Sequence, residues 1–240
     1  MSASFAEQSP LHVAIEPDGH GSWALAHGLP RSDGHGAGVD ALRRVVRAAP
    51  DLGVGVLTIQ ALGCDDERSS EPERLAMLAC IRALLELETP AFVRSGVRVT
   101  VLGCRERLPA EVGRAIEETE RATAQGTRLH LRLALDYSAR RAILAAFLGA
   151  IVGPPGQPAC FGPDVDFLIC TGGERRLRDF MLWECANAEL VFADAPWPEF
   201  GERELAAAVS EFRRRRVAAS SLAIARDSTA PDSCAAPAFP

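Results

Sequence analysis

The sequence predicts one α/β domain, built on a mostly parallel sheet with helices on both faces. Apolar runs of strand length alternate with longer stretches of helical periodicity, which is typical of this class. Two of the apolar runs end in glycine turns with a carboxylate nearby, Asp18-Gly19 and Gly172-Gly173-Glu174. In parallel sheets ligands bind outside the carboxyl ends of the strands, so we expect the functional site at these turns. Two phosphate-sized sites at one edge suggest two phosphorylated ligands or one long ligand.

The expected sheet has six strands, each a run of apolar, β-branched or alternating residues. The strands cover residues 11–15, 54–61, 97–102, 128–135, 165–169 and 189–193. Helices are expected over 39–49, over 71–87 with an extension to 93 after a break at Pro90, and over 109–124, 139–150 and 176–188. The spacing of Leu205, Ala208, Val209 and Phe212 predicts a last amphipathic helix.

Local signals mark two helix starts and the limits of the domain. Ser70-Glu71-Pro72-Glu73 has the spacing of a capping box with proline in the first turn, and Ser138 is a candidate cap for the helix after it. A loop rich in Gly and Pro spans 153–163. We expect a flexible segment at 1–10, a folded domain at 11–217, and a disordered tail at 218–240 that is rich in Ala, Ser, Pro and Asp.

Composition excludes several function classes. A net charge of −6 without a broad basic stripe argues against nucleic acid as the main partner. The first ten residues lack the features of a signal peptide, and the longest apolar run, 142–152, is shorter than the roughly 20 residues of a membrane span. The 7 cysteines include no C-x-x-C pair, so we expect reduced thiols in the cytoplasm rather than zinc or a disulfide framework.

The first glycine turn carries the main chemical signal. Glycines at a strand end allow a ligand close to the backbone, and free N–H groups at a helix start favour an anion. Asp18 would repel a bare phosphate, but a divalent cation between the two groups removes the conflict. The sequence therefore predicts a magnesium–diphosphate site, with a plain strand-to-helix turn and an exposed Asp18 as the alternative.

Two other phosphate-binding motifs fit poorly. Gly19-x-Gly21-x-x-Ala24 formally matches the dinucleotide fingerprint, but Asp18 would face the pyrophosphate. The bulky Trp23 fills a variable position, and the second strand ends in Gln60-Ala61 instead of an acidic residue. The sequence has no G-K-[ST], which excludes a P-loop.

Several cations and one further acid are candidate ligand groups. Arg31 and His35 are four residues apart, with His35 at the expected helix start; they either bind phosphate or are a solvated Arg and a capping His. Arg175, Arg176 and Arg178 follow the second glycine turn, where a helix dipole disfavours cations unless an anion is bound. Residues 213–216 lie at a helix C-terminus, which favours cations without a ligand. Glu189 is either exposed or a second acid for magnesium.

The spaced motifs together resemble the cis-prenyltransferase (undecaprenyl diphosphate synthase-like) family over residues 11–217. They are His12-Val-Ala-Ile-x-x-Asp18-Gly19-x-Gly21-x-Trp23-Ala24, Arg31-x-x-Gly34-His35-x-x-Gly38, Thr171-Gly172-Gly173-Glu174-x-Arg176, Phe180-x-Leu182-Trp183, Ala188-Glu189-Leu190 and Trp197-Pro198-x-Phe200. The resemblance implies a six-stranded parallel sheet, a homodimer, a hydrophobic tunnel and a Mg²⁺-dependent reaction. In that reaction an allylic diphosphate ionises and the double bond of isopentenyl diphosphate attacks it.

The resemblance also implies roles for individual residues. Asp18 would hold the metal and assist departure of diphosphate, and Glu189 would be a metal ligand from the neighbourhood of the dimer partner. The allylic diphosphate would be bound by Gly19, His20, Gly21, Ser22, Trp23, Arg31 and His35. Arg176, joined by Arg178, would bind the second diphosphate.

The chain departs from the family pattern mainly on the isopentenyl diphosphate side. His20 stands where the family usually has Asn, and Ser22 where it has Arg. The aromatic-Ser-Ser-Glu-Asn-Trp stretch is replaced at 62–67, the Arg before the second glycine turn is Cys170, and the C-terminal Arg-x-Gly ends in Ala218. A neutral thiol cannot replace charge-assisted bonds to a diphosphate. Cys170 therefore predicts weak binding of isopentenyl diphosphate, unless Arg175 or Arg178 supplies the charge.

Three functions follow from this pattern. The first is cis elongation to a short chain with an adapted second site. The second is a repurposed enzyme that ionises an allylic diphosphate and then cyclises it or couples it irregularly, as lavandulyl-forming members do. The third is a non-catalytic partner subunit, against which the retained acids Asp18 and Glu189 argue, because such a subunit needs no metal.

Overall fold

The computed structural model describes residues 10–63, 70–152 and 161–227. Its strands are β1 (Leu11–Glu16), β2 (Val54–Gly63), β3 (Val97–Leu102), β4 (Leu129–Tyr137), β5 (Phe167–Cys170) and β6 (Glu189–Phe192). Its α-helices are α1 (His20–Ala26), α2 (Arg31–Ala48), α3 (Glu71–Ser95), α4 (Ala110–Thr123), α5 (Ala139–Val152) and α6 (Glu202–Asp227). Short 3₁₀ turns cover Pro50–Leu52, Arg105–Arg107 and Trp197–Glu199.

The strands form one six-stranded sheet in the order β3-β4-β2-β1-β5-β6, and all paired neighbours are parallel. The predicted α/β class and six-stranded sheet are confirmed. β1 lies in the interior of the sheet and every one of its residues is buried, as expected for a strand that is covered on both faces.

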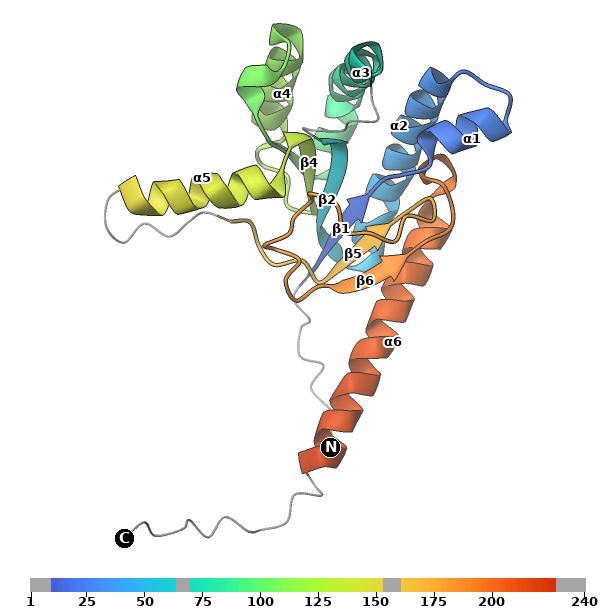
Figure 1. Cartoon of the computed structure of the whole chain (residues 1–240), viewed down its shortest axis with the longest axis vertical. Helices are drawn as coiled ribbons and strands as arrows, with labels where there is room; N and C mark the ends of the chain where they lie inside the picture. The colour runs from blue at the N-terminus through green and yellow to red at the C-terminus, as the bar shows by residue number, and fades with distance from the viewer. Residues whose placement is uncertain (1–9, 64–69, 153–160, 228–240) are drawn as a thin grey trace.

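The two faces of the sheet are covered differently (Figure 1). Helices α2, α3, α4 and α6 pack on one face, where the main core includes Ile15, Leu57, Leu85 and Phe212. A smaller core lies on the other face, beneath the start of α5 and the segment 171–188, and includes Ala14, Leu168 and Phe180. Most of α5 extends away from the body.

The helix caps agree with the local signals. Glu73 donates its backbone N–H to the Ser70 hydroxyl at 3.4 Å, and its carboxylate accepts from the Ser70 backbone N–H at 2.9 Å, which confirms the capping box. Ser138 caps α5 by accepting from the Arg141 backbone N–H at 3.1 Å. The predicted break at Pro90 is wrong, because α3 runs through it to Ser95. Buried side chains on both sides of Pro90, including Leu85 and Phe92, hold the helix against the core.

Three other predicted boundaries require correction. Residues 176–188 form bends followed by turns and not a helix: Phe180 and Met181 are both buried, and Met181 has a left-handed backbone with φ 47°. Helix α2 begins at Arg31, so His35 lies within the helix and not at its start. Helix α6 continues to Asp227, beyond Ala218, where the sequence predicts the start of the tail, so residues 213–216 lie inside the helix and not at its C-terminus.

Parts of the sequence predictions fall outside the described residues. These are the segments 1–9, 64–69, 153–160 and 228–240, with Cys64, Cys160 and Cys234. The described cysteines, Cys80, Cys104, Cys170 and Cys185, are free thiols. Among the described residues no helix combines the length and apolarity needed to cross a bilayer.

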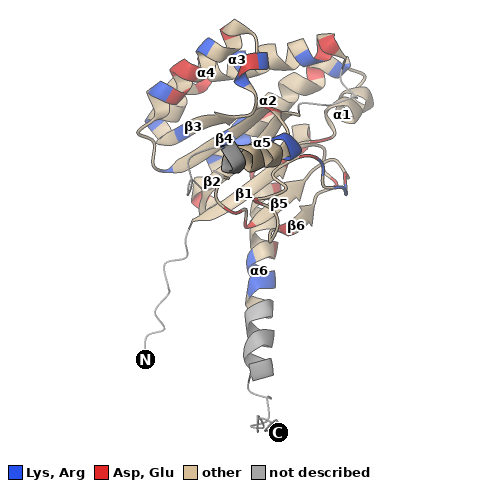
Figure 2. Cartoon of the chain, turned by 60° about the vertical axis from the view of Figure 1, so that its left-hand side comes forward, with Lys and Arg blue, Asp and Glu red and all other residues tan. Residues whose placement is uncertain are grey.

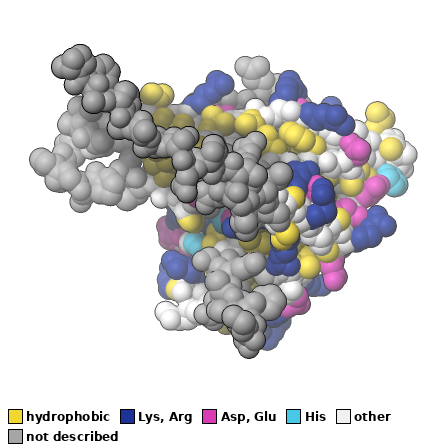
Figure 3. Space-filling view, turned by 90° about the horizontal axis from the view of Figure 1, so that it is seen from below, with side chains coloured by type: hydrophobic (Ala, Val, Ile, Leu, Met, Phe, Trp, Pro, Cys, Tyr) yellow, Lys and Arg dark blue, Asp and Glu magenta, His cyan; other side chains and the backbone are white. Residues whose placement is uncertain are grey.

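Charges of both signs are spread over the described surface. Acidic and basic residues share the outer faces of α3 and α4, and a basic turn marks α6 (Figure 2). The view from below likewise shows basic, acidic and apolar side chains interspersed over the coloured surface (Figure 3). The carboxyl ends of β1 and β5 lie side by side, which brings the two glycine turns together.

Candidate active site

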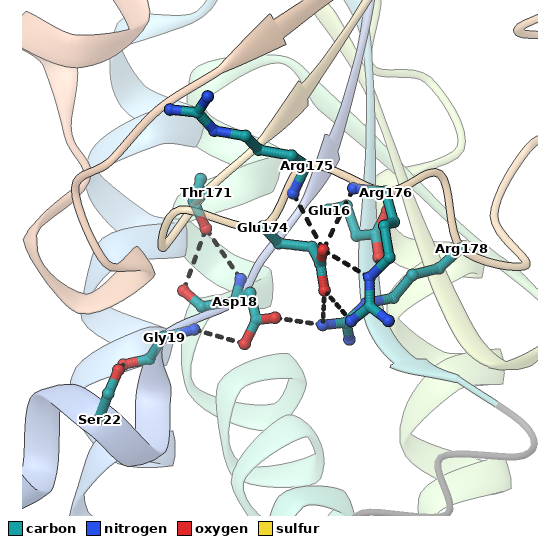
Figure 4. A network of polar contacts seen from close by, with 9 residues as sticks. All are labelled: Glu16, Asp18, Gly19, Ser22, Thr171, Glu174, Arg175, Arg176 and Arg178. Carbon is teal, nitrogen blue, oxygen red and sulfur yellow. Dashed lines mark hydrogen bonds and ion pairs between the residues drawn. The ribbon is translucent and has the colours of Figure 1, made fainter.

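The two glycine turns are joined through the backbone of Asp18 (Figure 4). The Asp18 N–H donates to the Thr171 hydroxyl at 2.8 Å, and that hydroxyl donates to the Asp18 carbonyl at 3.1 Å. A Cβ at Gly172 would lie 2.8 Å from the same carbonyl oxygen, so only glycine permits this approach. Gly19 adopts φ 93° against Pro196. Two segments that are far apart in sequence therefore form one rigid edge.

One guanidinium at this edge contacts three carboxylates (Figure 4). Arg178 Nε lies 3.1 Å from Glu16 Oε1, and Nη2 donates to Glu174 Oε2 at 3.0 Å and to Asp18 Oδ2. Arg176 also binds Glu174, with Nε and Nη2 at 2.9 and 2.8 Å. These arginine hydrogen bonds hold the pKa of Glu174 well below its usual range. At the mouth of the site the Arg178 guanidinium thus bridges the carboxylates of Asp18 and Glu174.

Glu16 is a site residue that the sequence motifs do not identify. Its side chain is 2% exposed, and among the described residues neither carboxylate oxygen has a well-formed hydrogen bond. Burial raises the pKa of Glu16 to about 7; Arg178 opposes this rise, and Asp18 and Glu174 add to it. The available signal was a carboxylate at the end of a mainly apolar interior strand, two positions after Ala14 on the same face.

Two histidines and one arginine occupy the α1–α2 side of the site. The rings of His20 and His35 lie 5.7 Å apart, and a Cβ at Gly38 would lie 2.6 Å from the His20 ring. Burial lowers the pKa of His20 to about 4 and also lowers that of His35, so both imidazoles are neutral at pH 7. Arg31 is mostly exposed, and its guanidinium lies over Gly21, 2.9 Å from where a Cβ would be.

The neighbouring turn residues have local contacts of their own. The exposed Ser22 donates its hydroxyl to the Gly19 carbonyl at 3.1 Å. The Trp23 ring lies 4.4 Å from the His27 ring. An apolar pocket opens beside His20 and His35, between α2, α3 and β2; its lining includes Val39, Leu42, Ile59, Met77, Ile81 and Trp197. A charged edge therefore adjoins an apolar pocket.

The structure does not bring every predicted site residue to this edge. Glu189 begins β6 and is in register with Phe167, which in turn pairs with Val13. It therefore lies at the opposite end of the strands from Asp18, where Arg215 is 3.6 Å away. Arg175 is exposed, and its guanidinium forms a long ion pair with Asp194, at 4.0 Å.

The residues at the edge fit a divalent cation that is shared with a substrate. Within the described residues no group of three or more His, Cys, Asp or Glu side chains is arranged to enclose a metal. Mg²⁺ is commonly held by one or two carboxylates together with substrate phosphates. Asp18 is partly exposed at the mouth, and it pairs with Arg178, whose guanidinium also contacts Glu16 and Glu174. The exposed part of the Asp18 carboxylate is where such a cation would bind.

Comparison with known proteins settles the family. Residues 17–219 match the family model described as putative undecaprenyl diphosphate synthase. The chain is 46% identical over 214 residues to "Isoprenyl transferase 1" of Bradyrhizobium diazoefficiens, which covers 85% of this chain and 87% of the relative. The chain belongs to the cis-prenyltransferase family. Another relative, "Isoprenyl transferase" of Caulobacter vibrioides, is 36% identical over 90% of this chain and 91% of its own length.

Solved structures agree with this membership. Lavandulyl diphosphate synthase from Lavandula x intermedia, in complex with dimethylallyl diphosphate, has a TM-score of 0.76 and 28% identity over 85% of this chain and 95% of its own. A probable undecaprenyl diphosphate synthase from Campylobacter jejuni has a TM-score of 0.71 and 23% identity, with 84% and 94% covered, and shows the same fold. As a cis-prenyltransferase, the chain is a transferase of isoprenoid biosynthesis.

Within this family fold, Cys170 is the departure that the geometry explains best. Cys170 ends β5, is fully buried, and pairs in register with Glu16. Burial, with the charges of Glu16 and Glu174, raises the pKa of the Cys170 thiol to about 12. The thiol is therefore uncharged at neutral pH, and the nearby positive charge is that of Arg178.

Proposed function

We propose that the protein is a Mg²⁺-dependent isoprenyl transferase that elongates an allylic prenyl diphosphate with isopentenyl diphosphate in cis geometry. The observation that carries this proposal is the junction of the charged edge at Asp18 with the apolar pocket between α2 and α3. A prenyl diphosphate has the same two parts, an anionic head and an apolar chain. The pocket is small, about 30 Å³, which favours a short product.

In this proposal the first glycine turn binds the allylic diphosphate. The backbone of Gly19 and Gly21 approaches the head group closely, and Arg31 supplies positive charge above Gly21. The neutral His20 and His35 donate hydrogen bonds without bringing additional charge to the pocket. When bound, Mg²⁺ stabilises the charge on the departing diphosphate, and Asp18 is the residue that would hold it.

The second glycine turn binds the other diphosphate, with Arg176 and Arg178 as its cations. The allylic cation is then captured by the double bond of isopentenyl diphosphate. Loss of a proton from the new intermediate completes the elongation. We assign the reaction to the cytoplasm, the compartment in which the reduced thiols predicted from the cysteine spacing are expected.

We also propose that the protein acts as a homodimer. Leu144, Phe147 and Leu148 are each at least half exposed on α5, which extends from the body (Figure 1). Clustered exposed apolar side chains favour a protein interface. Glu189, at the amino end of β6, can reach a metal at Asp18 only across such an interface. Light scattering at micromolar concentration is expected to give twice the chain mass of 25.6 kDa, and a mass of one chain would count against the dimer.

Irregular coupling is the second candidate, and the similarity to lavandulyl diphosphate synthase favours it specifically. The comparisons support a transferase and do not support the cyclase alternative. The deciding experiment supplies dimethylallyl, geranyl or farnesyl diphosphate with Mg²⁺, with and without isopentenyl diphosphate, and identifies the products. Linear cis products that require isopentenyl diphosphate are expected. A branched dimer of dimethylallyl units would favour irregular coupling, and turnover without isopentenyl diphosphate would overturn the elongation proposal.

A further inference from the structure

A buried carboxylate stands beside an uncharged strand end in the second half of the site. Glu16 and Cys170 are register partners at the carboxyl ends of β1 and β5, and both side chains are buried. A buried carboxylate without a partner is costly, and the cation that lies against Glu16 is Arg178, from the loop after the second glycine turn.

We propose that Glu16 is a positioning residue that fixes Arg178 at the carboxyl end of β5, where Arg178 supplies the positive charge that binds isopentenyl diphosphate. This inference rests on the proposed function, which requires a second diphosphate beside the first. Arg178 replaces the charge that Cys170 lacks, and Glu16 holds Arg178 in that position.

The contacts of Arg178 differ at its two ends. Nε faces Glu16, whose side chain is 2% exposed, whereas Nη2 faces Asp18, whose side chain is 32% exposed. An incoming diphosphate can therefore replace the outer contact while the inner one stays in place. Exchange of a carboxylate for a diphosphate at Nη2 also frees an oxygen of Asp18, the residue that would hold Mg²⁺.

The other arginine contact does not compete with this exchange. Glu174 accepts two hydrogen bonds from the Arg176 guanidinium and two more from the backbone N–H groups of Arg175 and Arg176. It therefore keeps these partners when Arg178 moves its outer nitrogen. A long flexible arginine without Glu16 would lose side-chain entropy when it binds a diphosphate, and anchoring reduces that cost in advance.

The first experiment is a double-mutant cycle on the full chain with Glu16→Gln, Arg178→Gln and the double variant. Steady-state kinetics give separate KM values for isopentenyl diphosphate and for the allylic substrate. Arg178→Gln is expected to raise the isopentenyl diphosphate KM at least tenfold and the allylic KM less than threefold. Glu16→Gln should raise the KM for isopentenyl diphosphate severalfold. The double variant should have the same KM as Arg178→Gln alone, because Glu16 acts through Arg178.

Two additional variants separate charge placement from simple stability. Cys170→Arg in the Arg178→Gln background should restore most of the isopentenyl diphosphate affinity by returning a guanidinium to the end of β5. Arg203→Ser removes an exposed arginine on α6, 93% exposed, and should leave both KM values unchanged. Equal changes in both KM values, or additive effects of Glu16→Gln and Arg178→Gln, would overturn the inference.

Direct binding separates this inference from the proposed function. Isothermal titration of isopentenyl diphosphate into the wild type and Arg178→Gln needs no turnover. Binding that Arg178→Gln abolishes, in a wild type that forms no condensation product, would support the inference and overturn elongation. Efficient elongation with unchanged isopentenyl diphosphate binding in Arg178→Gln would overturn the inference alone. Thermal unfolding of each variant reports whether it folds, and Glu16→Leu in the Arg178→Leu background tests the pair without a buried charge.

Discussion

The two ends of β1 bury polar side chains on the same face of the sheet but treat them in opposite ways. At the amino end, His12 Nδ1 donates to the carbonyls of Pro163 and Asp164 at 3.1 and 3.0 Å, and Nε2 accepts from the Thr58 hydroxyl at 2.8 Å. At the carboxyl end, Glu16 depends on the ion pair with Arg178. The hydrogen bonds of His12 are all made within the protein, whereas the charged groups around Glu16 can also interact with a ligand.

This difference indicates which end can be changed without loss of activity. A polar group with all its hydrogen bonds stabilises the native state and rigidifies its surroundings. Glu16, Asp18 and Glu174 all contact the Arg178 guanidinium, and Glu174 also pairs with Arg176, so a bound metal ion or diphosphate changes the balance of charge at this end. We therefore expect substitutions at the amino end to alter stability alone, and substitutions at the carboxyl end to alter catalysis in addition to any effect on stability.

The largest expected effect is that of Asp18→Ala at the carboxyl end. Loss of the carboxylate that would hold Mg²⁺ removes several kcal/mol of transition-state stabilisation. Because each increase of about 1.4 kcal/mol in activation free energy lowers the rate tenfold, turnover should fall by at least about 100-fold. Stability should hold or rise, because Arg178 keeps Glu16 and Glu174 as partners.

Product formation from radiolabelled isopentenyl diphosphate measures turnover, and urea unfolding measures stability. Asp40→Ala, which removes an exposed carboxylate on α2 that pairs with Arg43, is the matched control and should have full activity. Turnover within tenfold of wild type in Asp18→Ala would remove Asp18 from the mechanism.

The fold and half of this site could be predicted from local sequence. β3 occurs at its predicted bounds, and the capping box at Ser70 starts α3 as expected, because both depend on residues adjacent in the chain. The convergence of Asp18 and Gly172 followed from parallel topology alone. Glu16 could not be assigned in the same way, because its significance comes from Arg178, which is 162 positions later in the sequence.

The predicted helix at 176–188 shows the limit of periodicity. Its arginines and apolar residues have helical spacing, but tertiary contacts determine the local conformation. Asp179 accepts from the Arg140 backbone N–H at 2.8 Å and from the Ser138 hydroxyl at the start of α5. Arg178 turns toward Glu16, and Phe180 is buried in the smaller core. These interactions limit helical hydrogen bonding to isolated bonds such as that from the Cys185 N–H to the Met181 carbonyl at 2.8 Å, and sequence spacing cannot reveal them.

The next largest effect is a pH dependence of opposite sign at the two ends. Burial lowers the pKa of His12 from 6.5 to about 4, so the unfolded chain binds the extra proton more readily. The contribution of His12 is complete above pH 6.5 and is lost as the pH falls toward 4. Glu16 has its pKa raised from 4.5 to about 7, so its contribution is complete below pH 4.5 and is lost as the pH rises through 7. Each change is on the order of 3 kcal/mol.

Urea unfolding between pH 4 and pH 8 tests this pair. His12→Leu should remove the component that rises with pH and lower stability at pH 7 by about 1–3 kcal/mol, because Thr58 and two carbonyls lose their partner. Glu16→Gln should remove the falling component, so that stability rises more steeply with pH than in the wild type. Parallel pH profiles for the wild type and both variants would contradict the assignment of these groups.

The smallest expected effect is that of Arg31→Ala, which tests how the carboxyl end divides its work between the two diphosphates. Arg31 is exposed and its ion pair with Glu73 is long, at 3.8 Å. Removal of Arg31 should therefore leave the free energy of unfolding within about 0.5 kcal/mol of wild type. One charge-assisted contact to the allylic diphosphate contributes roughly 1.5–3 kcal/mol, which corresponds to about a tenfold or greater loss of affinity. Calorimetric titration with a non-ionising analogue of the allylic diphosphate measures this loss, with Arg47→Ala on the same helix as the control.

Because Arg178 lies on the other glycine turn, isopentenyl diphosphate affinity should change little in Arg31→Ala. Equal losses for both ligands would mean that the two turns form one undivided anion site, and unchanged affinity for the analogue would leave Arg31 as a solvated surface residue.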